Sequence, residues 1–422
     1  MIRGKQNWKR PVTLAAWTLL ILFFFNACKK EEEKLPESPV ENIPAIAAGD
    51  IDLTFNPGTG ANWPVNVAII QPDGKILVGG PFSSYHGTLT SGICRINPDG
   101  SLDNSFKGDA FEVKCMALQP DGKILIGGDF AMYNGVARYR FARINPNGTL
   151  DNTFDMEGVT IRSGVPAVYC IALQPDGKII IGGSFDEYNG ETRYNIARLY
   201  PDGSLDTSFN AKTGGSVHAI AIRNDGKIYA GGAFSSFNGA SIGWGVTRLN
   251  ADGSLDEAFN SGSGLWASRG MTNDAVVRAF AIQPDGKVVI AGYFHAYNGI
   301  YKSGIIRINP DGALDQTFTG VGVSDMGGES VNHVSVQADG KIIISGGFSS
   351  YRGTGRGGIC FINPDGTLDN AFVPKAITRA TGPFASSISA HAVQADGKII
   401  VVGEFGGYDG VSRNRIVRIL GK

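Results

Sequence analysis

Short apolar runs separated by tight Asp-Gly turns recur along most of the chain. The tripeptide Asp-Gly-Lys occurs between two apolar runs in each repeat, at intervals of 48 to 60 residues. Its copies begin at Asp73, Asp121, Asp176, Asp225, Asp285, Asp339 and Asp396. A period near fifty with four short β-like segments per copy is typical of a β-propeller, in which each repeat forms one blade.

Residues 101–145 show how one repeat is built. Its apolar runs predict strands at 102–106, 113–118, 124–126 and 141–145, with a loop before the last of them. A Gln-Pro-Asp-Gly-Lys turn joins the second and third strands, and Asn-Pro-Asp-Gly turns recur between repeats. Pro presets φ, Asp bonds its own backbone and Gly accepts positive φ, so both are tight hairpin turns. They should lie at one end of every blade.

The two ends of the repeat region indicate how the ring closes. The first Asp-x-x-Phe strand, at residues 51–55, has no blade before it, and the last blade stops after residues 417–420. A terminal strand that completes the last blade removes two open sheet edges. We therefore predict an all-β fold, a seven-bladed β-propeller with four-stranded blades that is closed by the N-terminal strand.

The repeat resembles a known family. Asp-Gly-Ser-Leu-Asp-x-x-Phe, Gln-Pro-Asp-Gly-Lys-Ile-x-x-Gly-Gly, Phe-x-x-Tyr-Asn-Gly and Ala-Arg-Ile-Asn together are similar to the delta-60 repeat of bacterial β-propellers, over residues 49–422. The resemblance implies a propeller in an exported bacterial protein and implies no reaction.

The N-terminal region has the pattern of an export signal. Four cations precede an apolar stretch at 12–25, and Asn26-Ala27-Cys28 resembles a lipobox. We expect residues 1–27 to be a lipoprotein signal peptide, Cys28 to be lipidated and residues 28–48 to be a disordered tether. The charged cluster at 29–34 resembles surface-export signals of Bacteroidetes lipoproteins, although it also fits a plain solvated tether. The expected location is the outer membrane, lipid-anchored and facing the exterior.

Charge and motif content exclude several functions. The formal net charge of −1 does not favour nucleic acid. The five histidines and the cysteines have no zinc-binding spacing, so we expect no metal and no cofactor. Nor does the sequence assemble a nucleophile–base set, so we do not expect an enzyme.

The variable loops opposite the Asp-Gly turns carry the remaining chemistry, because rigid scaffolds commonly place function in such loops. Trp, Tyr and Arg are the usual anchors of binding surfaces, although they can also plug the rim between blades. The ligand-binding hypothesis comprises Trp63, Trp244, Trp266, Arg269, Arg278, Tyr301 and Lys302. Polar residues at the start of the innermost strands should rim the channel at the same end, namely Asn66, Lys114, Tyr169, His218, Arg278, Asn332 and Ser389.

These features predict a cell-surface lipoprotein that binds a glycan or a protein through one face of the propeller. Two alternatives stay open. The chain could be a structural subunit of an envelope complex, or a propeller enzyme acting on carbohydrate through loop carboxylates.

Overall fold

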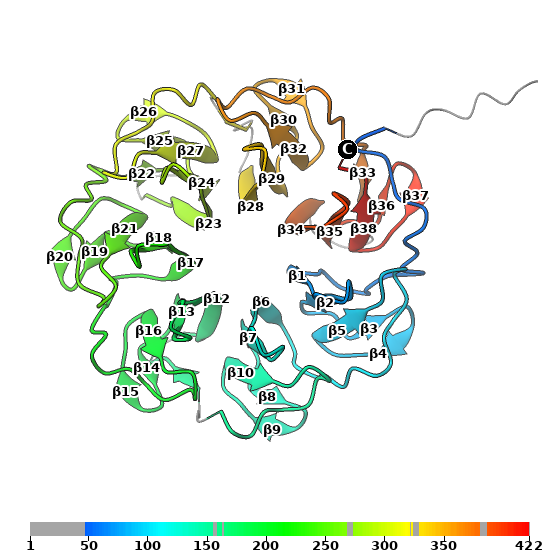
Figure 1. Ribbon diagram of the computed structural model, residues 1–422, viewed down its shortest axis with the longest axis horizontal. Helices are drawn as coiled ribbons and strands as arrows, with labels where there is room; N and C mark the ends of the chain where they lie inside the picture. The colour runs from blue at the N-terminus through cyan, green and yellow to red at the C-terminus, as the bar shows by residue number, and fades with distance from the viewer. Residues whose placement is uncertain are drawn as a thin grey trace, which may run out of the picture. The chain divides into compact units, whose positions relative to one another are not determined.

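Seven antiparallel sheets stand around a common axis in residues 46–422 (Figure 1). The computed structural model describes residues 47–154, 158–162, 164–267, 273–320, 322–323, 329–379 and 386–421. The expected signal peptide, Cys28, most of the tether and Arg269 lie outside these residues. The fold is all-β, as predicted, with seven blade-like units. Within the described part of the chain, no helix is long and apolar enough to cross a bilayer.

Each blade has three main strands, ordered from the axis outward. Blades are numbered 1 to 7 along the chain. Their main strands are β1 (Val67–Ile70), β2 (Ile76–Gly79) and β5 (Ile93–Ile96); β6 (Val113–Leu118), β7 (Ile124–Gly128) and β10 (Phe141–Ile144); β12 (Ala167–Leu173), β13 (Ile179–Ser184) and β16 (Ile196–Leu199); β17 (Val217–Ile222), β18 (Ile228–Gly232) and β21 (Val246–Leu249); β23 (Val276–Ile282), β24 (Val288–Tyr293) and β27 (Ile305–Ile308); β28 (Ser330–Val336), β29 (Ile342–Gly347) and β32 (Ile359–Ile362); and β34 (Ser387–Val393), β35 (Ile399–Glu404) and β38 (Ile416–Ile419).

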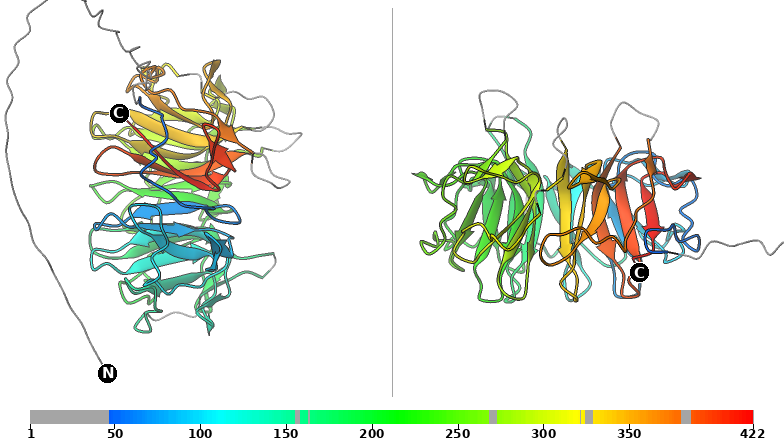
Figure 2. Two further views of the ribbon diagram at one scale, coloured as in Figure 1. Left: turned by 90° about the vertical axis from the view of Figure 1, so that its right-hand side faces the viewer. Right: turned by 90° about the horizontal axis from the view of Figure 1, so that it is seen from above.

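The strands run between two faces of the ring, which Figure 2 shows edge-on. The Asp-Gly-Lys turn joins the first and second strands of a blade at one face, and the Asn-Pro-Asp-Gly turn leaves the third strand at the same face. We call this the turn face and the opposite one the loop face. The middle strands are buried because neighbouring blades cover both of their sides. All residues of β7 are buried, and so are all residues of β29 except the last.

The expected outermost strand is shorter than predicted. Only one residue pair forms a bridge to the third strand, for example Ile96 with Leu102. The next residues turn instead of continuing, because Asp103 Oδ1 accepts hydrogen bonds from the backbone and hydroxyl of Ser105. This Asx turn competes with the ladder and ends it. The Asp-x-x-Phe motif is therefore a bridge followed by a turn.

The expected loop after Gly-Gly-x-Phe is a second small hairpin on the outside of each blade (Figure 1). Its central residues both have positive φ, as in Asn134 (46°) and Gly135 (77°), which is the type I′ geometry that Asn-Gly favours. The strand pairs are β3 (Ser84–Tyr85) with β4 (Thr88–Leu89), β8 (Met132–Tyr133) with β9 (Val136–Ala137), β14 (Glu187–Tyr188) with β15 (Glu191–Thr192), β19 (Ser236–Phe237) with β20 (Ala240–Ser241), β25 (Ala296–Tyr297) with β26 (Ile300–Tyr301), β30 (Ser350–Tyr351) with β31 (Thr354–Gly355), and β36 (Gly407–Tyr408) with β37 (Val411–Ser412). A third strand joins three of them: β11 (Val159–Thr160), β22 (Leu265–Trp266) and β33 (Ile377–Thr378).

A buried tyrosine fixes most of these hairpins to the turn face. The Tyr133 hydroxyl donates to the carbonyl of Gly148, the last residue of its blade's Asn-Pro-Asn-Gly turn, at 2.6 Å. The same bond recurs at 2.5 to 2.8 Å from Tyr85, Tyr188, Tyr297, Tyr351 and Tyr408. Blade 4 has Phe237 at this position. The Tyr of the Tyr-Asn-Gly motif is thus a structural residue.

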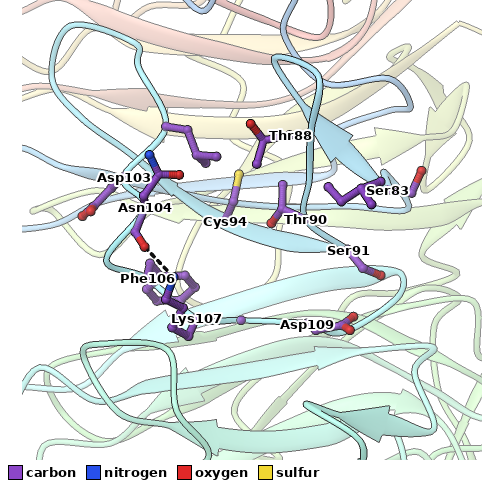
Figure 3. Close-up of a pocket in the computed structure, with 13 residues that line it drawn as sticks. Ser83, Thr88, Thr90, Ser91, Cys94, Asp103, Asn104, Phe106, Lys107 and Asp109 are labelled. Carbon is purple, nitrogen blue, oxygen red and sulfur yellow. Dashed lines mark hydrogen bonds between the residues drawn. The ribbon is translucent and has the colours of Figure 1, made fainter.

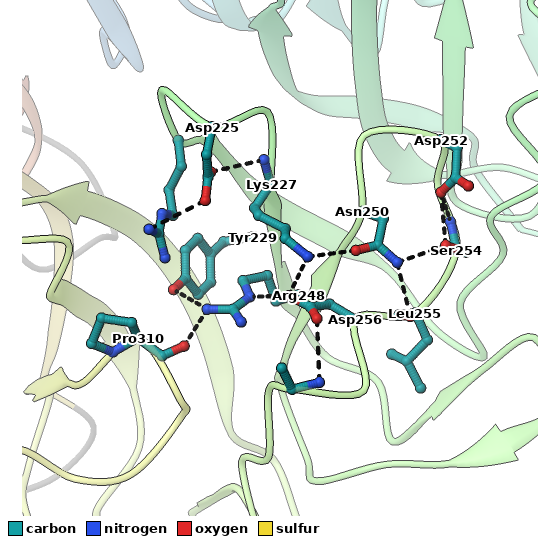
Figure 4. A network of polar contacts seen from close by, with 12 residues as sticks. Asp225, Lys227, Tyr229, Arg248, Asn250, Asp252, Ser254, Leu255, Asp256 and Pro310 are labelled. Atoms are coloured by element: carbon teal, nitrogen blue, oxygen red, sulfur yellow. Dashed lines mark hydrogen bonds and ion pairs between the residues drawn. The ribbon is translucent and has the colours of Figure 1, made fainter.

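An arginine on the third strand links each blade to the next. Arg248 donates from Nε to Asp256 Oδ2 and from Nη1 to the carbonyl of Pro310 in the following blade's turn, while Lys227 also contacts Asp256 (Figure 4). Its guanidinium lies over the Phe259 ring at 5.2 Å from the centroid. Equivalent arginines repeat these three contacts: Arg95, Arg143, Arg198, Arg307 and Arg418. We call this residue the clamp arginine.

The aspartates that face the clamp arginines stay ionised. Burial alone would raise the pKa of Asp103, but hydrogen bonds from Lys75, Ser105 and Arg95 outweigh burial and hold this pKa far below its usual range. Blade 6 is the exception, since Phe361 replaces the arginine and stacks on Phe372 at 4.3 Å between centroids. Of the lysine and arginine partners found in the other blades, Asp369 therefore has the lysine alone, with Lys341 Nζ 2.6 Å from its carboxylate.

The start and the end of the propeller unit are hydrogen bonded to each other. Ile51 forms a bridge with Ile419, and Asp52 accepts the clamp bond of Arg418 at 2.8 Å. Gly49 takes the place of a turn glycine, with φ of 95° and its carbonyl bonded to Tyr408. Beyond these contacts, β1 lies against β34 as other innermost strands lie against their neighbours. The terminal segment thus supplies the outer bridge, the aspartate and the phenylalanine of blade 7.

Removing this segment tests the predicted closure. A chain that begins at residue 57 leaves Arg418 and Tyr408 without their partners and uncovers the edge of β38. We expect its melting temperature to fall by roughly 10 °C or more relative to a chain that begins at residue 47. Equal melting temperatures for the two chains would show that ring stability does not depend on the terminal strand.

The clamp can be tested in blade 3, where Asp206 is fully buried. Arg198→Met leaves Lys178 as the one cation that contacts this carboxylate among the described residues, and we expect the free energy of unfolding to fall by about 3 kcal/mol in chemical denaturation. The double variant Arg198→Met/Asp206→Leu should recover part of the loss, because no buried charge is left unpaired. A single variant as stable as the wild type contradicts the role assigned to the clamp.

Candidate functional site

The loop face carries a ring of polar side chains around the axis. In six innermost strands the pairing register shifts by one residue near the strand start, for example between Val277 and Ala279. Such a bulge turns the extra side chain away from the ladder. The residues at this repeat position form what we call the collar: Asn66, Lys114, Tyr169, His218, Arg278, Asn332 and Ser389.

Contacts between blades order much of the collar. Arg278 donates to Asn332 Oδ1 at 2.7 Å, and Asn332 donates to the carbonyl of Ile388 in the next blade at 2.8 Å. Tyr169 and His218 stack with their centroids 4.5 Å apart. Burial, and then the charges of Arg278 and Lys114, lower the pKa of His218 to about 4, so this imidazole is neutral at pH 7. The expected polar rim is present, and blades share it.

A groove opens beside the collar where blades 7, 1 and 2 meet. It has a volume of about 600 Å³. We call it the rim groove, and its lining residues are Trp63, Pro64, Asn66, Pro81, Ser83, Phe111, Glu112, Lys114, Ser387, Ser389 and Glu404. It therefore joins three collar residues, Asn66, Lys114 and Ser389, to the loop residues that precede their innermost strands.

Two exposed aromatic side chains occupy equivalent positions in this groove. Trp63 and Phe111 both lie ten residues before the Asp of Asp-Gly-Lys, in adjacent blades, and are 51% and 55% exposed. The other blades have Pro166, Gly215, Ala275, Glu329 and Ser386 at this position. Since those residues serve the same scaffold, an aromatic ring is not needed there for folding.

Charged groups in the groove are mostly balanced. Lys114 Nζ contacts Glu112 Oε1 at 2.6 Å. Glu404 is part-buried, and burial raises its pKa while the nearby Arg415 opposes the shift. Ser387, Ser389 and Asn66 add uncharged hydrogen-bonding groups. The groove thus offers aromatic faces and neutral polar groups in preference to a strong net charge.

The hypothesised ligand residues that the structure describes, which exclude Arg269, are spread over several places. Trp63 lies in the rim groove and Arg278 in the collar. Trp244 is half-buried between blades 4 and 5, with its indole N–H donating to the Ala275 carbonyl at 2.8 Å. Lys302 donates to the carbonyls of Gly320 and Phe318.

Trp266 and Tyr301 lie on the outside of blade 5. Trp266 of β22 and Tyr301 of β26 both lie opposite Ala296 of the central strand β25. Their side chains therefore share one face of this small three-stranded sheet. They are about half exposed. The structure therefore places these two aromatic residues on the circumference, away from the collar.

Another cavity, of about 460 Å³, is lined by blade 1 and the segment that leaves it, near Asp103 and Lys107 (Figure 3). An equivalent cavity in blade 4 is lined by Leu255, Phe259 and Asn260, the counterparts of Leu102, Phe106 and Lys107. A space that recurs with the repeat is a property of the scaffold. Among the described residues, no group of three or more His, Cys, Asp or Glu side chains could hold a metal ion.

Sequence reasoning missed the groove residues Phe111, Glu112 and Glu404. A signal was present for Phe111, because it occupies the repeat position of Trp63. No comparable signal marks Glu404, which reaches the groove from blade 7, more than 300 residues along the chain from Trp63.

The repeats match a family described as a domain of unknown function (DUF5122) β-propeller. The matched segments are residues 71–106, 119–154, 174–209, 223–259, 283–318, 337–372 and 394–420. The chain belongs to this family of β-propellers. No curated protein sequence matches it.

Several solved structures are similar to this chain at low sequence identity, and the first of those below shows the same fold. The WD40 β-propeller domain of Doa1 matches with a TM-score of 0.50 and 15% identity, over 89% of this chain and 97% of that one. The extracellular domain of the hybrid two-component system BT3049 from B. thetaiotaomicron has a TM-score of 0.49 and 14% identity, over 87% of this chain and 40% of that one. The gluconolactonase XC5397 from Xanthomonas campestris has a TM-score of 0.42 and 13% identity, over 87% and 98%. The chain spans 39–40% of the length of the extracellular domains it matches.

Proposed function

We propose that this protein is a non-catalytic binding module whose ligand lies in the rim groove. The observation that carries the proposal is the pair Trp63 and Phe111, two exposed rings at one repeat position in adjacent blades. Large exposed aromatic side chains that the scaffold does not require are typical anchors of a binding surface. The loop face is also where the repeats differ most from one another.

The chemistry of the groove favours a glycan with little charge. A sugar ring stacks its C–H face on an aromatic ring while its hydroxyls bond to neutral polar groups, and the groove supplies both. Asn66, Ser387 and Ser389 are suitable hydrogen-bond partners. Glu112 is engaged by Lys114, so neither contributes a free charge for a strongly ionic ligand.

The proposed place of action is the cell surface, with the propeller tethered through a lipid on Cys28. The lipobox-like Asn26-Ala27-Cys28 and the charged cluster at 29–34 support this assignment. An acyl anchor contributes about 0.8 kcal/mol for each buried CH₂, so two or three chains hold the protein firmly. A tether of some twenty residues lets the loop face reach an extracellular ligand.

A glycan-binding screen with the double variant Trp63→Ala/Phe111→Ala tests the groove. We expect the Kd for the bound glycan to rise at least about tenfold, because loss of an aromatic anchor commonly costs more than 1 kcal/mol. Trp266→Ala is the matched control, since it removes an exposed indole outside the groove, and should leave the Kd unchanged.

Other outcomes of this screen identify the alternatives. Unchanged binding by the double variant places the ligand elsewhere. Absence of any glycan binding, with capture of a defined envelope protein, favours the structural subunit. Turnover of a bound glycan would instead identify a carbohydrate-active enzyme.

Cell fractionation of Cys28→Ser tests the anchor. The variant should leave the membrane fraction, because the thiol that would carry the acyl chains is gone. Replacement of residues 29–34 by neutral residues in the lipidated protein should make it resistant to protease added to whole cells. A Cys28→Ser protein that still sediments with membranes contradicts lipidation at this residue.

A further inference from the structure

The junction between blades 6 and 7 contains a buried pair of histidines. His333 of β28 and His391 of β34 face each other with Nδ1 atoms 3.3 Å apart and ring centroids 4.4 Å apart. The His391 ring nitrogens also contact Ser335 Oγ and Ser345 Oγ, each at 2.8 Å. His391 is almost fully buried, at 2% exposure. The residues are 58 positions apart, so their spacing in the sequence gave no indication of this contact.

The repeats show that this cluster is a local departure from the scaffold. Position by position, the other blades have small or apolar residues where the cluster has polar ones. His333 corresponds to Val67, Cys115, Cys170, Ala219, Ala279 and Ala390, and His391 to Ala68, Met116, Ile171, Ile220, Phe280 and Val334. Ser345 corresponds to Gly79, Gly127, Gly182, Gly231, Ala291 and Val402. Several polar residues have therefore replaced apolar ones at a single junction.

The same junction differs at the turn face. Elsewhere a clamp arginine donates to the carbonyl of the next blade's turn, as Arg307 does to Pro364. Blade 6 has Phe361 at that position, so the described residues include no clamp bond from blade 6 to blade 7. The junction thus lacks the arginine-to-carbonyl hydrogen bond of the other junctions and has uncharged imidazoles at its centre. An ion pair between Lys375 and Asp50 of the terminal segment, at 3.1 Å, remains.

We propose that the junction of blades 6 and 7 is an acid-sensitive seam, the place where the propeller opens first when the pH falls. Protonation of both imidazoles sets two positive charges side by side in a buried space. Ser335 and Ser345, the hydroxyl groups that face the pair, cannot neutralise that charge. No charged group on the described strands packed around the pair faces it. Arg278 of β23 is hydrogen bonded to Asn332, and Glu404 of β35 lies opposite Ser387 in the ladder, at the loop face. The thiol of Cys360 on β32 is buried and neutral.

The sign of the pH dependence follows from burial. Burial lowers the pKa of His333 from 6.5 to about 4. Burial also holds the pKa of His391 well below its usual value, with the charge of His333 as a second cause. The unfolded chain therefore binds protons more readily than the folded one. The stability given by the neutral pair is complete above pH 6.5 and is lost as the pH falls from 6.5 toward 4. Each imidazole that titrates only when unfolded raises the unfolding constant by up to tenfold for each pH unit in that interval.

Hydrogen–deuterium exchange at pH 7 and pH 5 tests the seam on the wild-type protein. We expect protection factors of the amides in β28 and β34 to fall more than tenfold at pH 5, while those of β6 and β7, which contain no histidine, change less than twofold. Protection that falls equally in all blades, or first in another blade, overturns the proposal.

Variants that copy sibling blades provide the second measurement. His333→Ala and His391→Val adopt the residues of Ala279 and Val334, so the double variant suits the scaffold. Its unfolding constant should change at least tenfold less between pH 7 and pH 5 than that of the wild type. His218→Asn, which copies Asn66 and Asn332 in the collar, is the matched control and should leave exchange in β28 and β34 as in the wild type. If the double variant keeps the full pH dependence of the wild type, the histidine pair is not the acid-sensitive element. If the double variant does not fold, hydrogen–deuterium exchange on the wild-type protein tests the seam instead.

Discussion

The clamp arginine is the interaction on which the rest of the propeller depends. One guanidinium bonds the aspartate of its own blade, reaches the turn carbonyl of the next blade and lies over the phenylalanine of Asp-x-x-Phe. It thereby fixes the outer bridge, the Asn-Pro-Asp-Gly turn and the junction between blades together. Each of these motifs recurs in the sequence because each meets the same side chain. A buried charge that loses one of these partners is destabilising, so the motifs are constrained jointly.

Since the clamp arginine and the tyrosine of the outer hairpin fix the turn face in most blades, the loop face is left to vary. Strand starts on that face carry bulged polar residues whose identity changes from Asn to Lys, Tyr, His, Arg and Ser around the collar. The rings of Trp63 and Phe111 stand beside it at a position where five other blades need none. The turn face thus repeats from blade to blade, whereas the loop face varies, and loops held on a rigid scaffold are where proteins commonly place function.

Much of the architecture could be predicted from the sequence, because the period and the turn chemistry are local. The seven repeats, both Asp-Gly turns and the pairing of residues near Ile51 with the last blade follow from them. The outer hairpins did not, although Tyr-Asn-Gly is a strong hairpin signal. The candidate site was harder to predict. The position of a residue in the repeat indicates whether it lies near the turn face or the loop face, but not how far it lies from the axis of the propeller. The repeat pattern places Trp244 and Trp266 at the same end of the blades as the collar. In the structure, however, Trp244 is packed between blades 4 and 5 and Trp266 lies on the circumference.

Departures from the repeat are the best guide to what this propeller does beyond folding. Blade 7 contains two of them on one strand, because β34 supplies Ser389 to the rim groove and His391 to the histidine pair two residues further on. Ser389 is the bulged residue of β34 and His391 lies in the regular ladder just after it, so a shift of this strand moves both residues. A displacement of β34 from β28 therefore moves one wall of the groove with it. The groove proposed as the binding site and the proposed seam therefore share β34, a strand of the blade that receives no clamp bond from blade 6.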